Sequence, residues 1–147
     1  MAYPQHIYIM VDTVVFTYQE EDLQVLLIER KSDPFKGSWA LPGGFVEDEE
    51  SLDTAAQREL EEETGIQVDE LFQFYTFGEP DRDPRGRAVS VAYFTKVNKE
   101  SVLPQAATDA ASVQWFSINS LPELAFDHAD ILDKAKESFL KSAQASQ

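Results

Sequence analysis

The densest group of ionisable side chains in the sequence lies between Gly44 and Ile66. This segment of 23 residues holds nine carboxylates and a single cation, Arg58. Nine acids and one arginine contribute -8 to a formal net charge of -15, so more than half of the imbalance comes from one short segment. An excess this local indicates a chemical role at that place, because charge that serves only solubility is spread over the surface.

Several of these acids fall on the apolar face of a predicted helix that spans Leu52 to Glu63. At about 100° per residue, this face consists of Leu52, Ala55, Ala56 and Leu60. Glu59 and Glu63 fall inside the apolar face, and Glu62 lies at its border. Glu61 points the opposite way. The helix therefore begins with a buried apolar face and ends with carboxylates on that same face.

This pattern favours a metal site over a solvated acidic helix. A solvated helix explains acids on the polar face but not Glu59 and Glu63. Like charges about 4–5 Å apart cost roughly 3–4 kcal/mol per pair at an effective dielectric near 20. A hard divalent cation removes that penalty and prefers oxygen ligands. Arg58 lies four residues before Glu62 and can form an ion pair with it.

The strands and helices that position these groups are predicted from the hydrophobic periodicity and from turn and capping residues. Strands are predicted at residues 6–18, 24–30, 72–77, 88–97 and 112–118, and a second helix at 127–142. Residues 31–44 are predicted to be a loop with a short extended piece at 39–41. Ser51 is the expected N-cap of the first helix, and Gly65 lies where a C-terminal glycine belongs. Interleaved strands and helices after a hairpin-like start predict a mixed sheet in an α/β/α sandwich.

Composition limits the class of protein. A chain of 147 residues with 43% hydrophobic and 27% charged residues suits one globular domain, residues 1–147, with a tail at 143–147 that we expect to fray. The absence of cysteine excludes disulfides, and no apolar run approaches the ~20 residues of a membrane helix. The start of the chain lacks a basic signal-peptide region. We therefore expect a soluble, cytoplasmic protein whose negative charge disfavours membrane and nucleic-acid partners.

The spacing of the acidic segment matches a known motif. It consists of Gly44, five residues, Glu50, seven residues and then RELEEETGI from Arg58 to Ile66. This resembles the Nudix box, G-x5-E-x7-R-E-U-x-E-E-x-G-U with U apolar, at every fixed position. The flanking stretches LLIERKSDPFKGSWALPGGFVE, YTFGEPDRDPRGRAVSVAYF and LAFDHADIL are similar to the ADP-ribose pyrophosphatase-like branch of that family. The resemblance covers residues 5–140.

The resemblance implies roles for the residues of the box, 44–66, as a loop–helix–loop in the Nudix sandwich. It implies that Mg²⁺, with Mn²⁺ as an alternative, is bound by Glu59, Glu62, Glu63 and the backbone carbonyl of Gly44. Arg58 matches the arginine that orients a box glutamate. Supporting roles fall to Glu50, the earlier acid of the box, and Gly65, its turn glycine.

The same resemblance implies an activity. Nudix hydrolases cleave a nucleoside diphosphate linked to another group by attack of water on phosphorus, and this branch predicts ADP-ribose as substrate, with AMP and ribose 5-phosphate as products. A nucleoside triphosphate, a dinucleoside polyphosphate or an NAD-like dinucleotide is the alternative. The base is expected to be Glu62 or Glu59, because the later loop, residues 105–112, carries Asp109 as its only acid. Many relatives dimerise, which leaves a homodimer open.

Six residues outside the box are candidate substrate contacts: Arg30, Phe35, Trp39, Arg82, Arg85 and Arg87. Arginine forks suit phosphate and ribose oxygens, and the two aromatic rings could stack on adenine. The alternatives are an ion pair for Arg30, core packing for the aromatic residues and a solvated hairpin tip for the other three arginines. His128 is expected to be a structural hydrogen-bonding group near the start of the last helix.

A regulator is the alternative from a different class. Some relatives of this branch sense ADP-ribose-type ligands, carry an added DNA-binding region and have a degraded box. Here the box is intact and the chain ends soon after its last predicted helix. We therefore expect an enzyme rather than an ADP-ribose-sensing regulator.

Overall fold

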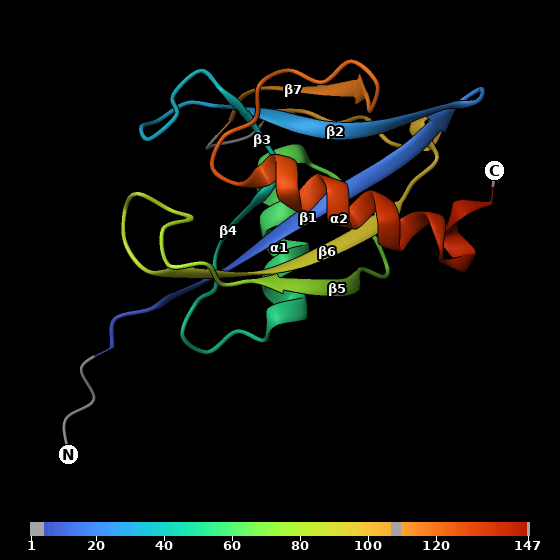
Figure 1. Cartoon of the computed structure of the whole chain (residues 1–147). Coiled ribbons are helices and arrows are strands. Elements are labelled where there is room, and N and C mark those ends of the chain that lie inside the picture. Colours follow the sequence, from blue (N-terminus) through green and yellow to red (C-terminus); the bar gives the residue numbers. More distant parts are fainter. Residues whose placement is uncertain (1–4, 107–109, 147) are drawn as a thin grey trace.

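The structure is a computed structural model that describes residues 5–106 and 110–146. Within them, a mixed sheet of seven strands lies between two helices (Figure 1). The strands are β1 (Tyr8–Gln19), β2 (Asp22–Arg30), β3 (Trp39–Ala40), β4 (Gly43–Phe45), β5 (Phe72–Phe77), β6 (Ala88–Lys96) and β7 (Ala110–Ser117). The helices are α1 (Leu52–Thr64) and α2 (His128–Leu140), with short 3-10 turns at Lys99–Ser101 and Ala143–Ala145. This α/β/α arrangement confirms the predicted fold class.

The sheet is mixed because β1 has neighbours of both directions. The central order is β3-β2-β1-β6-β5, while β4 pairs with β1 and β7 pairs with β2. β1 runs parallel to β6 and antiparallel to β2 and β4. β4 is a strand that the sequence did not predict. Two of its three residues are glycine, and it pairs with β1 so that Gly44 lies opposite Val11.

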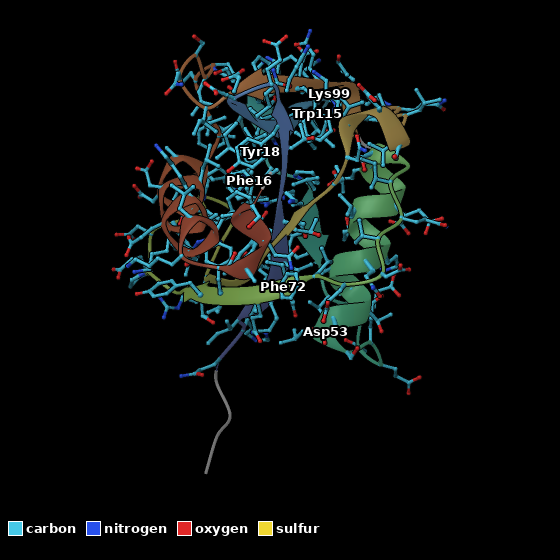
Figure 2. The ribbon with its side chains drawn as sticks, turned by 90° about the vertical axis from the view of Figure 1, so that its right-hand side faces the viewer. Phe16, Tyr18, Asp53, Phe72, Lys99 and Trp115 are labelled. Carbon is cyan, nitrogen blue, oxygen red and sulfur yellow. The ribbon has the colours of Figure 1, made fainter. Side chains whose placement is uncertain are left out.

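The alternation of side chains along β1 divides the core into two layers. Val14 and Phe16 face α2, where the Phe16 ring stacks on Phe139 with the ring centroids 4.5 Å apart. Val11 and Val15 face the opposite way and belong to the clusters that contain the apolar residues of α1, Ala55, Ala56 and Leu60. Figure 2 shows the two helices on opposite sides of β1, with Phe16 labelled. Burying a valine, leucine or phenylalanine side chain contributes about 1.5–3 kcal/mol, so both helices are held firmly on the sheet.

Local signals determine where α1 begins and ends. The Ser51 hydroxyl accepts a hydrogen bond from the Thr54 amide at 3.2 Å, as expected for an N-cap. Gly65 adopts a left-handed conformation with φ 75°, and its amide donates to the Glu61 carbonyl at 2.8 Å. Both predicted caps are confirmed, and the apolar face of the helix is the buried one.

The C-terminal residues 143–146 contact the sheet. The Tyr18 hydroxyl donates to the Ala145 carbonyl at 3.0 Å, and the Lys96 ammonium donates to the Ser146 carbonyl. The fraying expected for 143–147 stays a prediction, and residue 147 lies outside the described part of the chain. None of the described helices is long and apolar enough to cross a membrane.

Replacing Gly65 with alanine should destabilise the fold, because a Cβ atom disfavours the left-handed conformation by roughly 1–2 kcal/mol. Urea denaturation should give a free energy of unfolding lower by that amount, with an unchanged slope. Gly78→Ala is the matched control: its backbone lies outside the left-handed region, and the nearest atom to an added Cβ is 4.0 Å away. Equal losses in the two variants would contradict the role assigned to Gly65.

Candidate functional site

Most of the polar side chains singled out in the sequence line one cavity of about 470 Å³. One wall is formed by the end of α1 and by β4, including Gly44, Glu59, Glu62 and Glu63. The other is formed by the end of β2, the β5–β6 loop and the segment before α2, with Arg30, Arg82, Asp83, Arg85 and Phe126. The cavity therefore has an acidic wall and a wall rich in arginine.

Arg58 organises the acidic wall. Its guanidinium makes a two-point contact with Glu50, with N–O distances of 2.5 and 2.9 Å. A third nitrogen contacts Glu59 at 2.6 Å and Glu62 at 3.1 Å, and the group also donates to the Phe45 carbonyl at 3.0 Å. These bonds lower the pKa of Glu50 and raise that of Arg58, in both cases chiefly through the Arg58–Glu50 hydrogen bonds. One cation thus offsets the repulsion among three acids.

The two glycines of β4 permit close approach to these acids. The Gly43 amide donates to Glu63 Oε1 at 2.7 Å, and Glu63 is only 6% exposed. A Cβ atom on Gly44 would lie 2.4 Å from Glu59 Oε2. Any side chain at Gly44 would therefore displace the Glu59 carboxylate. The glycine at this position is explained by its contact with the site.

The donor set on this wall fits a hard divalent cation. Glu59, Glu62, Glu63 and the Gly44 carbonyl supply only oxygen, which Mg²⁺ and Mn²⁺ prefer. The three side chains differ in exposure: Glu59 and Glu63 are largely buried, while Glu62 is 48% exposed. Across residues 5–106 and 110–146, no three acidic or histidine side chains are close enough to form a metal site as they stand. Ligation would therefore require these side chains to move closer together around the metal.

The arginine wall is held by its own ion pairs. Arg82 is buried and makes a two-point contact with Asp127 at 2.9 and 2.7 Å. Arg85 makes the same kind of contact with Asp83 at 3.0 and 2.8 Å. Burial raises the pKa of Asp83, but the hydrogen bonds from Arg85 outweigh this and leave it below its ordinary value. The two arginines are therefore fixed in place, with Arg82 inside the wall and Arg85 partly exposed at its surface.

Phe126 is the apolar centre of this wall. Arg30 and Arg85 both lie over its ring, with guanidinium carbons 4.9 and 5.2 Å from the ring centroid. Arg85 is also 5.1 Å from the ring of Phe45, which connects the two walls. Burial, and then the charge of Arg85, lower the pKa of Arg30. Two cations thus converge on one side of the cavity.

Three predicted substrate contacts do not line the cavity. Trp39 packs edge-on against Phe116 in the core, with ring centroids 4.9 Å apart. Phe35 is 42% exposed, with its ring 4.8 Å from that of Phe126. Arg87 is exposed just before β6. Arg30, Arg82 and Arg85 do line it, and Asp109 lies outside the described residues.

The cavity also contains groups that the sequence analysis did not assign to the site. Asp12 and His128 line it from β1 and the first turn of α2. Asp12 carried a recognisable signal, because a carboxylate in the middle of a β-branched, otherwise apolar strand is rarely buried without a partner. Phe126 gave no such indication in the sequence, since an aromatic residue in a loop belongs to the core as often as to a binding site.

Comparison with known proteins gives a consistent result. The NUDIX domain model matches residues 9–135. The ADP-ribose pyrophosphatase of Methanocaldococcus jannaschii is 45% identical over 115 residues, which are 77% of this chain and 66% of that protein. The ADPR responsive transcriptional repressor NtrR of Acinetobacter baylyi is 40% identical over 129 residues, 85% of this chain and 51% of the repressor. This chain therefore spans about two thirds and one half of these two relatives.

A solved structure extends the comparison to the fold. The NUDIX domain of Shewanella oneidensis NrtR, crystallised with ADP ribose, superposes with a TM-score of 0.85 and 34% sequence identity. The match covers 92% of this chain and 90% of that chain.

Glu50→Gln should lower the melting temperature near neutral pH, because a neutral amide cannot replace the charge-assisted contact with Arg58. The pKa of Glu50 lies below its ordinary value of 4.5. The stability that its carboxylate contributes is therefore present above pH 4.5 and is lost as the pH falls through the lowered pKa. Thermal unfolding of both proteins across this range should show the difference in melting temperature shrinking in acid.

Glu49→Gln provides the control for this pH series. Glu49 is an exposed neighbour with no ion pair among the described residues, and it undergoes the same change in charge. Its melting temperature should follow the wild type throughout. A Glu50→Gln difference that stays constant with pH would contradict the assigned contact.

Proposed function

This chain belongs to the Nudix family, and on that premise we propose that it is a divalent-metal-dependent hydrolase of ADP-ribose that releases AMP and ribose 5-phosphate. The observation that carries the proposal is the cavity whose acidic wall, with Glu59 and Glu63, faces the cations Arg30 and Arg85. A diphosphate bound to a metal needs both walls, because the oxygen ligands hold the cation and the arginines hold the remaining phosphate charge. The similarity to an ADP-ribose pyrophosphatase supports the choice of substrate.

Glu59, Glu62, Glu63 and the Gly44 carbonyl would hold the metal, which we propose to be Mg²⁺ or Mn²⁺. When bound, it supplies neutralisation of the phosphate oxygens and a lowered pKa for the attacking water. The Gly43 amide fixes one oxygen of Glu63 at the wall of the cavity. The two-point contact with Glu50 fixes Arg58, so that its remaining nitrogen orients Glu59.

Glu62 is the better placed of the two candidate bases. It is 48% exposed and receives one hydrogen bond, at 3.1 Å from Arg58. Glu59 is largely buried and receives a shorter bond, at 2.6 Å. A carboxylate with unoccupied lone pairs at the edge of the cavity can accept a proton from water and release it to solvent. Arg30 and Arg85 would bind the phosphates or ribose from the opposite wall.

A second candidate function has an observation in its favour. The chain is also similar to an ADPR responsive transcriptional repressor, and its fold matches a NUDIX domain crystallised with ADP ribose. A sensor would bind ADP-ribose without cleaving it and would require a nucleic-acid partner. The intact set of Glu59, Glu62 and Glu63 supports the hydrolase.

Product identity with a panel of nucleotides tests the function directly. The purified chain, with Mg²⁺ or Mn²⁺, should convert ADP-ribose to AMP and ribose 5-phosphate faster than it cleaves nucleoside triphosphates, dinucleoside polyphosphates or NAD. Chelation of the metal should abolish turnover. Binding of ADP-ribose without products would favour the sensor, and preferential cleavage of another nucleotide would correct the substrate.

Glu63→Gln should lower kcat by about 100-fold, because the loss of one ligand charge weakens the metal site. Glu61→Gln is the matched control in the same turn of α1: Glu61 faces solvent, where its carboxylate accepts a hydrogen bond from Gln67. It should retain activity close to that of the wild type. Equal losses would contradict the assignment of the inward acids, and steady-state kinetics at several metal concentrations decide between the outcomes.

Arg85→Ala should raise KM for ADP-ribose by about tenfold with little change in kcat, because one charge-assisted contact to bound substrate contributes about 1.5–3 kcal/mol. Arg87→Ala removes the same charge two residues further along, where the side chain does not line the cavity. Its KM should stay near that of the wild type. A larger effect at Arg87 than at Arg85 would place the substrate elsewhere.

A further inference from the structure

A buried network of polar groups contacts the β3–β4 turn and includes Asp12 and His128, which line the cavity but have no role in the proposed reaction. The Ser90 hydroxyl donates to Asp12 Oδ2, and Asp12 Oδ1 faces His128 Nε2 at 3.5 Å. His128 Nδ1 accepts the Leu41 amide at 3.0 Å. All four residues are at most 5% exposed. This polar network joins β6, β1 and the start of α2 to the turn that precedes β4.

Burial determines the protonation of Asp12 and His128. It raises the pKa of Asp12 and lowers that of His128, although the attraction between the two groups opposes both shifts. Because Nδ1 of His128 accepts a hydrogen bond, the proton of the neutral ring lies on Nε2, which faces Asp12. Apolar side chains of similar size would fill the same space without the cost of burying polar groups. A role beyond packing is therefore required.

This polar network contacts the Leu41–Gly44 turn, which forms part of the acidic wall. Asp12 is the register partner of Gly43, and a Cβ atom on Gly43 would lie 2.5 Å from Asp12 Oδ1 and 2.2 Å from the Val11 carbonyl. Leu41, which His128 holds, lies two residues earlier. The amide of Gly43 then donates to Glu63. The direction of this amide thus depends on contacts from two sides, at Asp12 and at His128.

We propose that Ser90, Asp12 and His128 form a positioning unit that holds the Leu41–Gly44 turn and thereby places Glu63 and the Gly44 carbonyl. Its consequence for metal affinity rests on the proposed function, whereas its consequence for the Gly43 amide does not. Asp12 and His128 also line the cavity. The role proposed for them is positioning through the backbone of the turn, and they are not among the proposed metal ligands.

Two substitutions at His128 separate this role from simple packing. His128→Asn introduces a side-chain oxygen that can replace Nδ1 as acceptor for the Leu41 amide. His128→Gln places its amide near the Nε2 position and loses that acceptor. In the metal-free full chain, amide hydrogen exchange at Leu41 and Gly43 should be about tenfold faster in His128→Gln than in the wild type. In His128→Asn it should stay close to the wild type.

A milder variant covers the case in which His128→Gln does not fold. Ser90→Ala removes the hydroxyl that holds Asp12 and should accelerate exchange at Gly43 in the same direction. Thr95→Val is the matched control, since Thr95 is a buried residue of the same strand whose hydroxyl donates to the Glu70 carbonyl, away from the turn. Its exchange at Leu41 and Gly43 should equal that of the wild type. Unchanged exchange at Gly43 in both Ser90→Ala and His128→Gln would overturn the proposal.

Mn²⁺ binding measured by electron paramagnetic resonance gives a second readout. The affinity should fall about tenfold in His128→Gln and be restored in His128→Asn. Equal affinities in all folded variants would overturn the link from the turn to the metal ligands. A wild-type chain that neither binds Mn²⁺ nor cleaves ADP-ribose would overturn the proposed function, while the exchange rates would still decide the positioning role.

Discussion

The repulsion among the carboxylates of α1 is the constraint on which the rest of the site depends. Glu59, Glu62 and Glu63 gather at one end of a short helix, and a helix dipole gives no help there, because its C-terminal end is itself negative. In the structure one cation, Arg58, offsets the charge of two of them and of Glu50. The divalent metal ion that we propose for this site would be attracted by the same carboxylates.

The Leu41–Gly44 turn connects these acids to the sheet. A Cβ atom on Gly43 would collide with the backbone of β1, and a Cβ atom on Gly44 would displace the Glu59 carboxylate. Backbone groups can then serve as partners, as the bond from the Gly43 amide to Glu63 shows. Because the turn pairs with β1 at the centre of the sheet, it has little freedom to move. Backbone held in this way gives a site more precision than mobile side chains do.

The arginine wall solves a different electrostatic problem. A chain with a net charge of -15 repels anions at a distance. The ion pairs of Arg82 with Asp127 and of Arg85 with Asp83 fix two guanidinium groups at one wall of the cavity. Arg30, over the Phe126 ring, adds a further cation to the same wall. These arginines place positive charge at the wall of the cavity to which we assign the anionic substrate.

Local chemistry made α1 and its acidic face predictable from the sequence. Caps at Ser51 and Gly65 and a helical period are encoded by near neighbours, so the positions of the inward acids follow from spacing alone. Only the tertiary structure decided that Asp12 meets His128 and that Trp39 belongs to the core. Such pairs lie far apart in the chain and are brought together by strand register and helix packing, which short-range patterns do not specify.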